Sequence, residues 1–117
     1  MKNTLTAIVL ATIGITAQAG EAEIRMSQKI VDINKGALSC GKVIKAEKIQ
    51  DTSKFLDVKA VCSNGEVYRM GIMYGSARDV KIAIQCSKTF TSQQDAYAKE
   101  AAQEMNITSA NCKNPKG

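Results

Sequence analysis

The sequence predicts an α+β domain, in which a four-stranded antiparallel meander has one helix before it and one after it and is held together by disulfides. Three features support this prediction. Apolar residues alternate along four successive segments, turn-forming residues separate these segments, and four cysteines occur in one small chain. The predicted strands cover residues 40–49, 55–62, 66–74 and 80–86, and the predicted helices cover residues 21–35 and 91–106.

Side chains along a strand point alternately to the two faces of a sheet, so apolar residues at every second position indicate one buried face. In all four segments the larger apolar residues fall mainly on even-numbered positions. The last three segments show this with Leu56, Val58 and Ala60, then Tyr68, Met70 and Ile72, then Val80, Ile82 and Ile84. The even-numbered face is therefore the predicted core face, and the odd-numbered face is predicted to be solvated.

The Ser63-Asn64-Gly65 link predicts the register of the second and third strands. A three-residue loop with Gly65 in a left-handed conformation pairs Val58 with Met70 and keeps both on the core face. A two-residue Asn-Gly turn would move the apolar row of the third strand to the opposite face. We therefore predict the three-residue loop.

The first hairpin has no glycine to mark its turn. A turn centred on Asp51 pairs Ile44 with Val58, whereas a turn centred on Thr52 pairs Ile44 with Ala60. Both centres keep the apolar rows on one face. Only the Asp51 centre also places the cysteines of these two strands opposite each other, so we predict that register.

The Gly75-Ser76-Ala77 stretch is the predicted turn between the third and fourth strands. It pairs Ile72 with Val80, and it therefore keeps Ile82 and Ile84 on the core face.

The four cysteines are Cys40, Cys62, Cys86 and Cys112, and an even count in an exported chain of this size predicts two disulfides. The preferred first hairpin places Cys40 opposite Cys62, which leaves Cys86 to pair with Cys112. The alternative joins Cys62 to Cys86 and Cys40 to Cys112, but Cys62 and Cys86 would then lie two strands apart, roughly 10 Å. A zinc site of four thiolates is a further alternative, although the chain has no C-x-x-C pair.

Two segments have helical periodicity. Residues 21–35 place apolar side chains on one stripe between acidic residues at the start and a lysine at the end. In residues 91–106, Tyr97, Ala101 and Met105 form one row, and neighbouring alanines permit close approach to a sheet. Each segment is predicted to pack on the sheet. The pattern leaves open whether the two helices share one face or cover both.

Residues 1–19 have the features of a cleaved signal peptide. Lys2 supplies the initial positive charge, residues 5–17 form an apolar run too short to span a bilayer, and Ala17-Gln18-Ala19 is a small-x-small cleavage site. Removing these 19 of the 117 residues leaves 98, enough for one domain over residues 20–117. We predict an exported protein, periplasmic or secreted, that is not attached to a membrane after cleavage.

The composition argues against most catalytic chemistry. The chain has no histidine, which excludes His-based acid–base, nucleophilic and metal sites, and it has no glycine-rich phosphate-binding motif. Asp57 and Glu47 could act as a carboxylate pair, but the predicted register sets them diagonally rather than opposite each other. We therefore predict no catalytic residue, no metal site and no cofactor.

The odd-numbered face carries a group of cations. The predicted register puts Lys59 opposite Arg69, with Lys45 and Lys81 on the same face. Like charges directly opposite each other are unfavourable, and a negatively charged partner would relieve that cost. Because the face has few aromatic residues on which bases could stack, the predicted partner is a protein and not a nucleic acid. An ordinary solvated face that keeps the sheet soluble is the alternative interpretation.

These features predict a non-catalytic exported binding module, such as an inhibitor or accessory factor that acts on another envelope or secreted protein through the basic face. One alternative is a small carboxylate- or lysine-dependent enzyme or toxin, and another is a structural envelope protein with no discrete site. The enzyme hypothesis requires the carboxylates to converge with Tyr68, Tyr74 or Tyr97 in one pocket.

Overall fold

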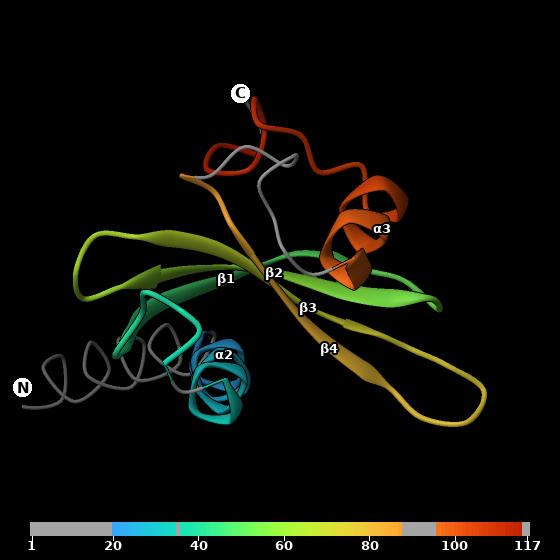
Figure 1. The fold of residues 1–117 in the computed structure, drawn as a ribbon, viewed down its shortest axis with the longest axis horizontal. Coiled ribbons are helices and arrows are strands. Elements are labelled where there is room, and N and C mark those ends of the chain that lie inside the picture. The colour runs from blue at the N-terminus through green and yellow to red at the C-terminus, as the bar shows by residue number, and fades with distance from the viewer. Residues whose placement is uncertain (1–19, 35, 88–95, 116–117) are drawn as a thin grey trace, which may run out of the picture.

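The computed structural model describes residues 20–34, 36–87 and 96–115, and it shows an α+β fold (Figure 1). The elements are α2 (Glu21–Ile33), β1 (Val43–Asp51), β2 (Phe55–Cys62), β3 (Val67–Met73), β4 (Val80–Gln85) and α3 (Ala96–Glu104). The strands form one antiparallel sheet in the order β1-β2-β3-β4, which confirms the predicted meander. The predicted signal peptide and residues 91–95 of the predicted second helix lie outside the described residues.

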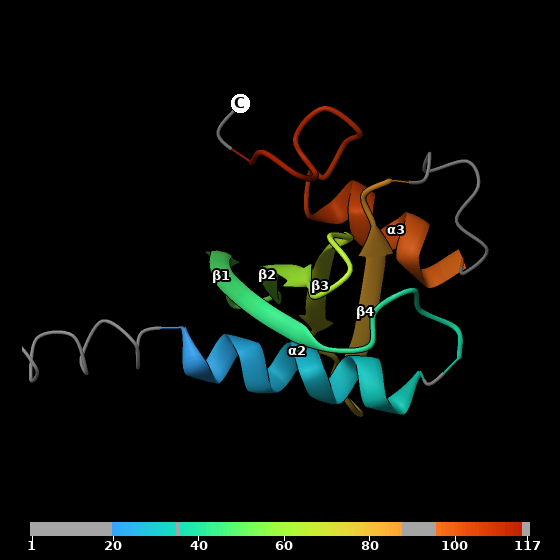
Figure 2. The ribbon, with the colours of Figure 1, turned by 90° about the vertical axis from the view of Figure 1, so that its left-hand side faces the viewer.

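The two helices cover opposite faces of the sheet, so the domain has three layers (Figure 2). We call these faces the α2 face and the α3 face. Buried apolar residues of the α2 face include Ile30, Val58, Ala60, Tyr68 and Met70. Those of the α3 face include Phe55, Ile82, Ile84, Ala101 and Met105. The prediction that only the even-numbered face is buried is therefore wrong, because α3 and the chain after it cover part of the other face.

The hairpin between β2 and β3 has the predicted register. Val58 is the partner of Met70, and Ala60 is the partner of Tyr68. Gly65 has φ +90°, the left-handed conformation that a three-residue loop requires at its end and that glycine adopts without steric cost. The sheet centre is thus built as the turn chemistry predicts.

The register of β3 and β4 differs from the prediction by one residue. Val80 pairs with Met73 and not with Ile72, and Ile82 pairs with Gly71. The loop over residues 74–79 has an even number of residues, so the even-numbered side chains of β4 join the odd-numbered side chains of β3. Ile82 and Ile84 consequently face α3, where a second apolar cluster buries them.

The register of the first hairpin matches neither predicted centre. Ala46 pairs with Ala60 and Val43 pairs with Cys62, and β1 has two irregularities, between Val43 and Lys45 and between Lys48 and Gln50. Ile44 therefore falls at a bulge, and it is 56 % exposed instead of lying in the core. Bulges add single residues to one strand, and no residue pattern in β1 marks them.

Both predicted disulfides are confirmed. Cys40 is bonded to Cys62 and Cys86 to Cys112, each with a Cα–Cα distance of 5.5 Å. Cys40 precedes β1, which begins at Val43, so it reaches Cys62 from the connecting loop and not from a paired strand position. The pairing is correct, although the hairpin register from which it was derived is wrong.

The helices end earlier than their periodicity predicts. α2 stops at Ile33 because Asn34 takes the C-cap position and its side-chain Nδ2 donates a hydrogen bond to the Ile30 carbonyl oxygen at 2.8 Å. α3 ends at Glu104, and the left-handed Asn106, with φ 57°, turns the chain away from the helix axis.

Candidate functional site

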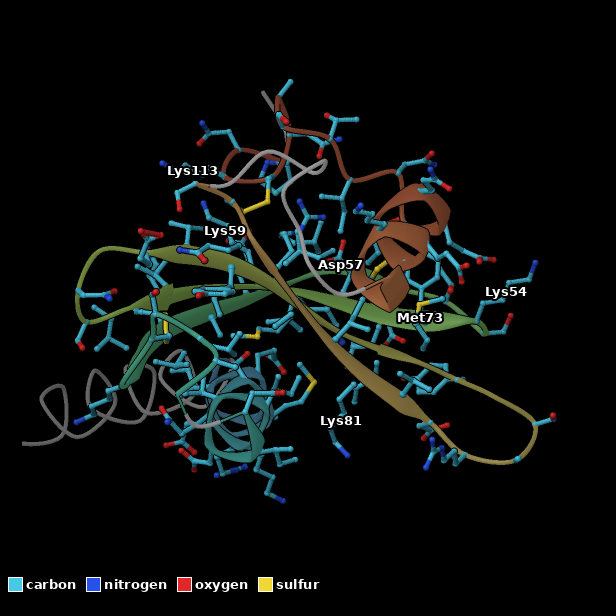
Figure 3. All side chains as sticks on the ribbon, viewed as in Figure 1. Lys54, Asp57, Lys59, Met73, Lys81 and Lys113 are labelled. Atoms are coloured by element: carbon cyan, nitrogen blue, oxygen red, sulfur yellow. A yellow bond between two sulfur atoms is a disulfide. The ribbon has the colours of Figure 1, made fainter. Side chains whose placement is uncertain are left out.

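The structure separates the four cations that the sequence places on one surface. Lys45 and Lys59 lie on the α3 face, since Lys45 pairs with Val61 and Lys59 pairs with Arg69. Lys81 pairs with Ile72 and so lies on the α2 face. Figure 3 shows Lys59 and Lys81 on opposite sides of the sheet.

Arg69 is not part of the surface, because it is buried in an ion pair with Asp57. The side chains of Asp57 and Arg69 are 0 % and 3 % exposed. Arg69 Nε donates to Asp57 Oδ1 at 2.9 Å, and Arg69 Nη2 donates to Asp57 Oδ2, which makes the contact bidentate. A buried carboxylate and a buried guanidinium offset each other's desolvation only in such a paired geometry.

The ion pair also holds the chain that follows α3. Arg69 Nη1 donates to the carbonyl oxygens of Asn111, at 2.9 Å, and Cys112, at 3.3 Å. Gln50 Nε2 bridges Asp57 Oδ2, at 2.8 Å, and the Met105 carbonyl oxygen, at 2.9 Å. Buried carbonyl groups outside regular structure need donors, and these two side chains provide them.

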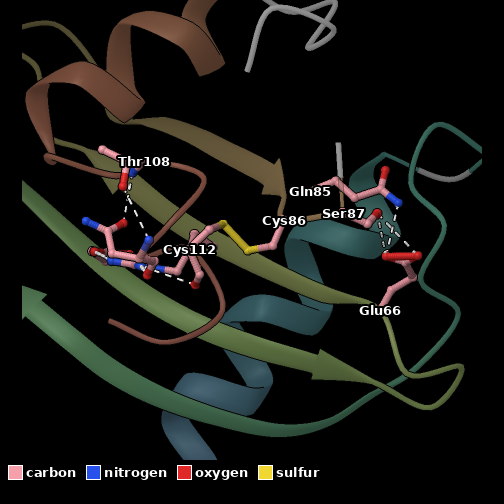
Figure 4. The surroundings of a disulfide bond; sticks show 9 residues. Glu66, Gln85, Cys86, Ser87, Thr108 and Cys112 are labelled. Carbon is pink, nitrogen blue, oxygen red and sulfur yellow. Dashed lines mark hydrogen bonds and ion pairs between the residues drawn. A yellow bond between two sulfur atoms is a disulfide. The ribbon is translucent and has the colours of Figure 1, made fainter. Parts of the chain in front are cut away.

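A disulfide and a local turn complete the attachment of this segment (Figure 4). Cys112 is bonded to Cys86, directly after β4. Within the segment, the Thr108 backbone N–H donates to Asn111 Oδ1, and Asn111 Nδ2 donates to the Asn106 carbonyl oxygen, both at 2.8 Å. Asp57 and Arg69 therefore have a structural role, although the residue pattern predicts that their face is solvated.

The sequence contained a partial signal for this ion pair. In the correctly predicted β2–β3 register, Asp57 and Arg69 are diagonal neighbours of opposite charge, close to Phe55 and Gly71 on the same face. The ion pair was not predicted because the odd-numbered face was expected to be solvent-exposed. A solvent-exposed ion pair contributes little to stability.

Part of the α3 face is left open, and lysines gather there. α3 packs mainly against β4, so the β1–β2 side of this face lies beyond the helix. On these strands Lys45 is exposed and Lys59 is half-buried. Lys113 comes close to them, because the carbonyl oxygen of the preceding Cys112 accepts a hydrogen bond from Arg69, the strand partner of Lys59. We call Lys45, Lys59 and Lys113 the lysine surface; one exposed acidic residue, Glu47, lies opposite Lys59 on the same face and leaves a surplus of positive charge. Among the described residues, none of the three is in a salt bridge.

Of the tyrosines, Tyr68 and Tyr74 have described side chains, and these two do not converge with Asp57. Tyr68 lies in the apolar cluster of the α2 face, and its hydroxyl accepts a hydrogen bond from the Ser39 backbone N–H at 2.8 Å. Burial raises the pKa of Tyr68; the Glu66 carboxylate adds to the rise, and the bond from Ser39 opposes it. Tyr74 is 42 % exposed beyond the end of β3, and the Tyr97 side chain is outside the described part.

A hollow of about 400 Å³ opens beside the C-terminal end of α2. Its lining includes Asp32, Asn34, Ser39 and Asn64. Two of these side chains already have partners, since Asn64 Nδ2 donates to the Ser39 carbonyl oxygen at 2.7 Å and Asp32 Oδ1 accepts from Gln28. The hollow therefore offers a polar surface without a convergent set of free donors and acceptors.

All four thiols are consumed in disulfides, so the cysteines do not form the alternative zinc site. In the described ranges, no three potential ligands of the types His, Cys, Asp and Glu are grouped to hold a metal ion. The two disulfides are consistent with an oxidising environment outside the cytosol. Of the helices in the part of the chain that the structure describes, none combines the length and hydropathy needed to cross a bilayer.

Comparison of this chain with protein-family models, with curated proteins and with solved structures finds no match.

Proposed function

We propose that this protein is a non-catalytic exported binding module, an inhibitor or accessory factor that contacts an acidic surface of another envelope or secreted protein. The observation that supports the proposal best is the lysine surface. Three lysines without salt-bridge partners among the described residues lie on the open part of a face that is otherwise covered. Half-buried Val61 lies opposite Lys45 and adds apolar contact area between the charges.

The remaining charged features favour binding over catalysis. Asp57 and Arg69, the charged pair at the centre of the sheet, neutralise each other and hold the C-terminal segment. Export is supported by the signal-peptide features of residues 1–19 together with the two disulfides. A mixed apolar and cationic surface of this kind suits recognition of a protein.

The test is affinity capture from a cell-envelope extract of the source organism with the tagged, oxidised protein. We expect one protein to be retained at low salt and less of it at physiological salt, because exposed charge pairs are screened within about 8–10 Å. A photo-crosslinking residue in place of Val61 should join the retained protein covalently and place the contact on this surface. The Lys45→Glu/Lys59→Glu variant should lose the retained protein.

Lys81→Glu is the matched control, because Lys81 is an exposed sheet lysine on the α2 face. It should retain the partner as well as the unmodified protein does. Arg69 is unsuitable for charge reversal, since a buried glutamate beside Asp57 would unfold the domain. Equal capture by both variants would place binding elsewhere, and no capture at either salt would favour a structural protein without a discrete site.

A further inference from the structure

A second hollow lies on the other half of the α3 face, between α3 and the ends of β3 and β4. We call it the α3 groove. One wall comes from α3, and the other comes from the last residues of β3 and the first of β4. The side chains that define it are Met73, Tyr74, Val80, Ile82, Glu100 and Glu104. Figure 3 shows Met73 beneath α3 at this position.

The floor of the α3 groove is apolar, and its rim is acidic. Ile82 is 3 % exposed, and Met73 and Val80 pack against the same apolar cluster. Glu100 and Glu104 are exposed and stand one helical turn apart on α3, so both carboxylates can face one ligand. The groove therefore combines surface for a hydrocarbon stem with two negative charges.

The negative charge of this rim is distinctive in a chain whose formal net charge is +5. Neither Glu100 nor Glu104 is in a salt bridge with another described residue. Lys99 and Arg78, cations close to the groove along the chain, do not line it. No described cation therefore competes with an outside cation for these carboxylates.

The size of the groove limits what it can hold. Its volume is about 210 Å³, whereas sites for drug-sized ligands and cofactors measure about 300–1,000 Å³. One long side chain fits a groove of this volume better than a whole small molecule does. Lysine and arginine bury a hydrocarbon stem while their charged head stays near the surface, which matches an apolar floor under an acidic rim.

Besides the apolar floor and the acidic rim, Tyr74 is a third feature of the groove that suits a cationic side chain. It is 42 % exposed and lines the groove, and an aromatic ring at such a site adds a favourable contact with a cation. We propose that the α3 groove binds a lysine or arginine side chain that a partner protein presents between apolar residues. This inference is independent of the lysine surface, which is made by β1, β2 and the segment after α3 and would attract the opposite charge.

The test is a titration of the isotope-labelled, oxidised protein with acetyl-Leu-Arg-Leu-amide at low salt, followed by ¹H–¹⁵N correlation spectra. We expect millimolar binding, with shifts centred on the amides of Met73, Tyr74, Glu100 and Glu104. Glu100→Gln/Glu104→Gln should weaken binding about fivefold, as two partly exposed ion pairs would. These side chains are exposed, so the variant should remain folded, which the spectrum itself reports.

Glu21→Gln/Glu23→Gln, with the same change in charge on α2, is the control and should bind as the unmodified protein does. Equal binding of acetyl-Leu-Glu-Leu-amide would overturn the proposal, as would unchanged binding by the Glu100/Glu104 double variant. Absence of shifts at about 10 mM arginine peptide, well above the expected dissociation constant of about 1 mM, would overturn it too. Concentration-dependent shifts without peptide, lost in the Glu100/Glu104 double variant, would instead assign the groove to a second copy of this chain.

Discussion

The two faces of the sheet are stabilised by different means. On the α2 face, a 13-residue helix contacts all four strands and covers an apolar cluster, and Ser27 is the one polar residue that this helix buries. On the α3 face, a nine-residue helix packs mainly on β4, and the irregular chain after it is hydrogen-bonded to Gln50 and Arg69 on the other strands. A regular helix satisfies its own backbone groups, whereas irregular chain needs donors from elsewhere. This difference explains why Asp57, Arg69 and Gln50 are on the α3 face.

Breaking the ion pair of the α3 face is expected to lower the stability of the protein more than any other change considered. Asp57→Ala leaves the Arg69 guanidinium buried without its carboxylate, and it should lower the free energy of unfolding by about 3–5 kcal/mol. Urea unfolding of the oxidised protein measures this loss. Glu47→Ala, at an exposed position of the same face, is the control and should change stability by less than about 0.5 kcal/mol. Similar losses in the two variants would mean that the pair does not hold this face.

A methyl group at Gly71 tests how closely α3 and the chain after it approach the sheet. An added Cβ would lie 2.7 Å from Met105 Cε and 2.9 Å from the Leu56 carbonyl oxygen, a backbone atom that cannot move alone. Gly71→Ala should therefore destabilise the protein by about 1–3 kcal/mol in urea unfolding. Gly41→Ala is the matched control, because nothing lies within 4 Å of its added Cβ. Unchanged stability of Gly71→Ala would show that the α3 face is loosely packed.

On the α2 face, the expected effects are smaller. Tyr68→Phe removes the acceptor of the Ser39 N–H and should cost about 1 kcal/mol at neutral pH. The folded-state pKa of Tyr68 is raised, so the folded protein holds this proton more tightly than the unfolded chain does. Its contribution to stability is complete below about pH 10 and is lost as pH rises through the folded-state pKa.

Alkaline unfolding of Tyr68→Phe should therefore depend less steeply on pH above about 10 than that of the unmodified protein. Circular dichroism in urea at a series of pH values measures both slopes. Tyr74→Phe, at an exposed tyrosine, controls for the titration of other groups in this range and should keep the original slope. Equal slopes in all three proteins would exclude Tyr68 as the source.

The smallest effect is expected at Ser27, and it has the opposite sign. Its side chain is 0 % exposed, and its Oγ has no hydrogen-bond partner among the described residues. Ser27→Ala removes this unpaired group and places the best helix former in the middle of α2, so stability should rise by about 0.5 kcal/mol or more. A thermal unfolding series with exposed Ser53→Ala as reference detects the change, and a loss of stability would show that the hydroxyl has a partner in solution.

The sequence predicted the central hairpin best, because Gly65 and the apolar alternation of β2 and β3 specify one register together. The two outer hairpins could not be predicted from the same pattern. In β1, bulges change the register at positions without a glycine or a break in the pattern, and they leave Ile44 exposed. In β4, the apolar residues alternate as predicted, but alternation does not say which of two covered faces they join.

The lysine surface, too, was predicted only in part from the sequence. Lys45 and Lys59 were predicted together and do share a face, whereas Arg69 and Lys81 were assigned to that surface and lie elsewhere. Lys113 belongs to the same surface only because the segment after α3 folds back over Arg69. No spacing in the sequence relates residue 113 to residue 59.

The sequence by itself determined the element order and the antiparallel meander, because period-two patterning and turn chemistry are local signals. Both disulfide pairs were also predicted, but from a first-hairpin register that the structure does not have. Only the tertiary structure decided that the helices take opposite faces, that Asp57 and Arg69 are buried together, and that the α3 groove forms. The physical reason is that burial depends on what covers a residue. For the α3 face that cover comes from residues 101–112, forty or more positions away from Asp57 in the chain.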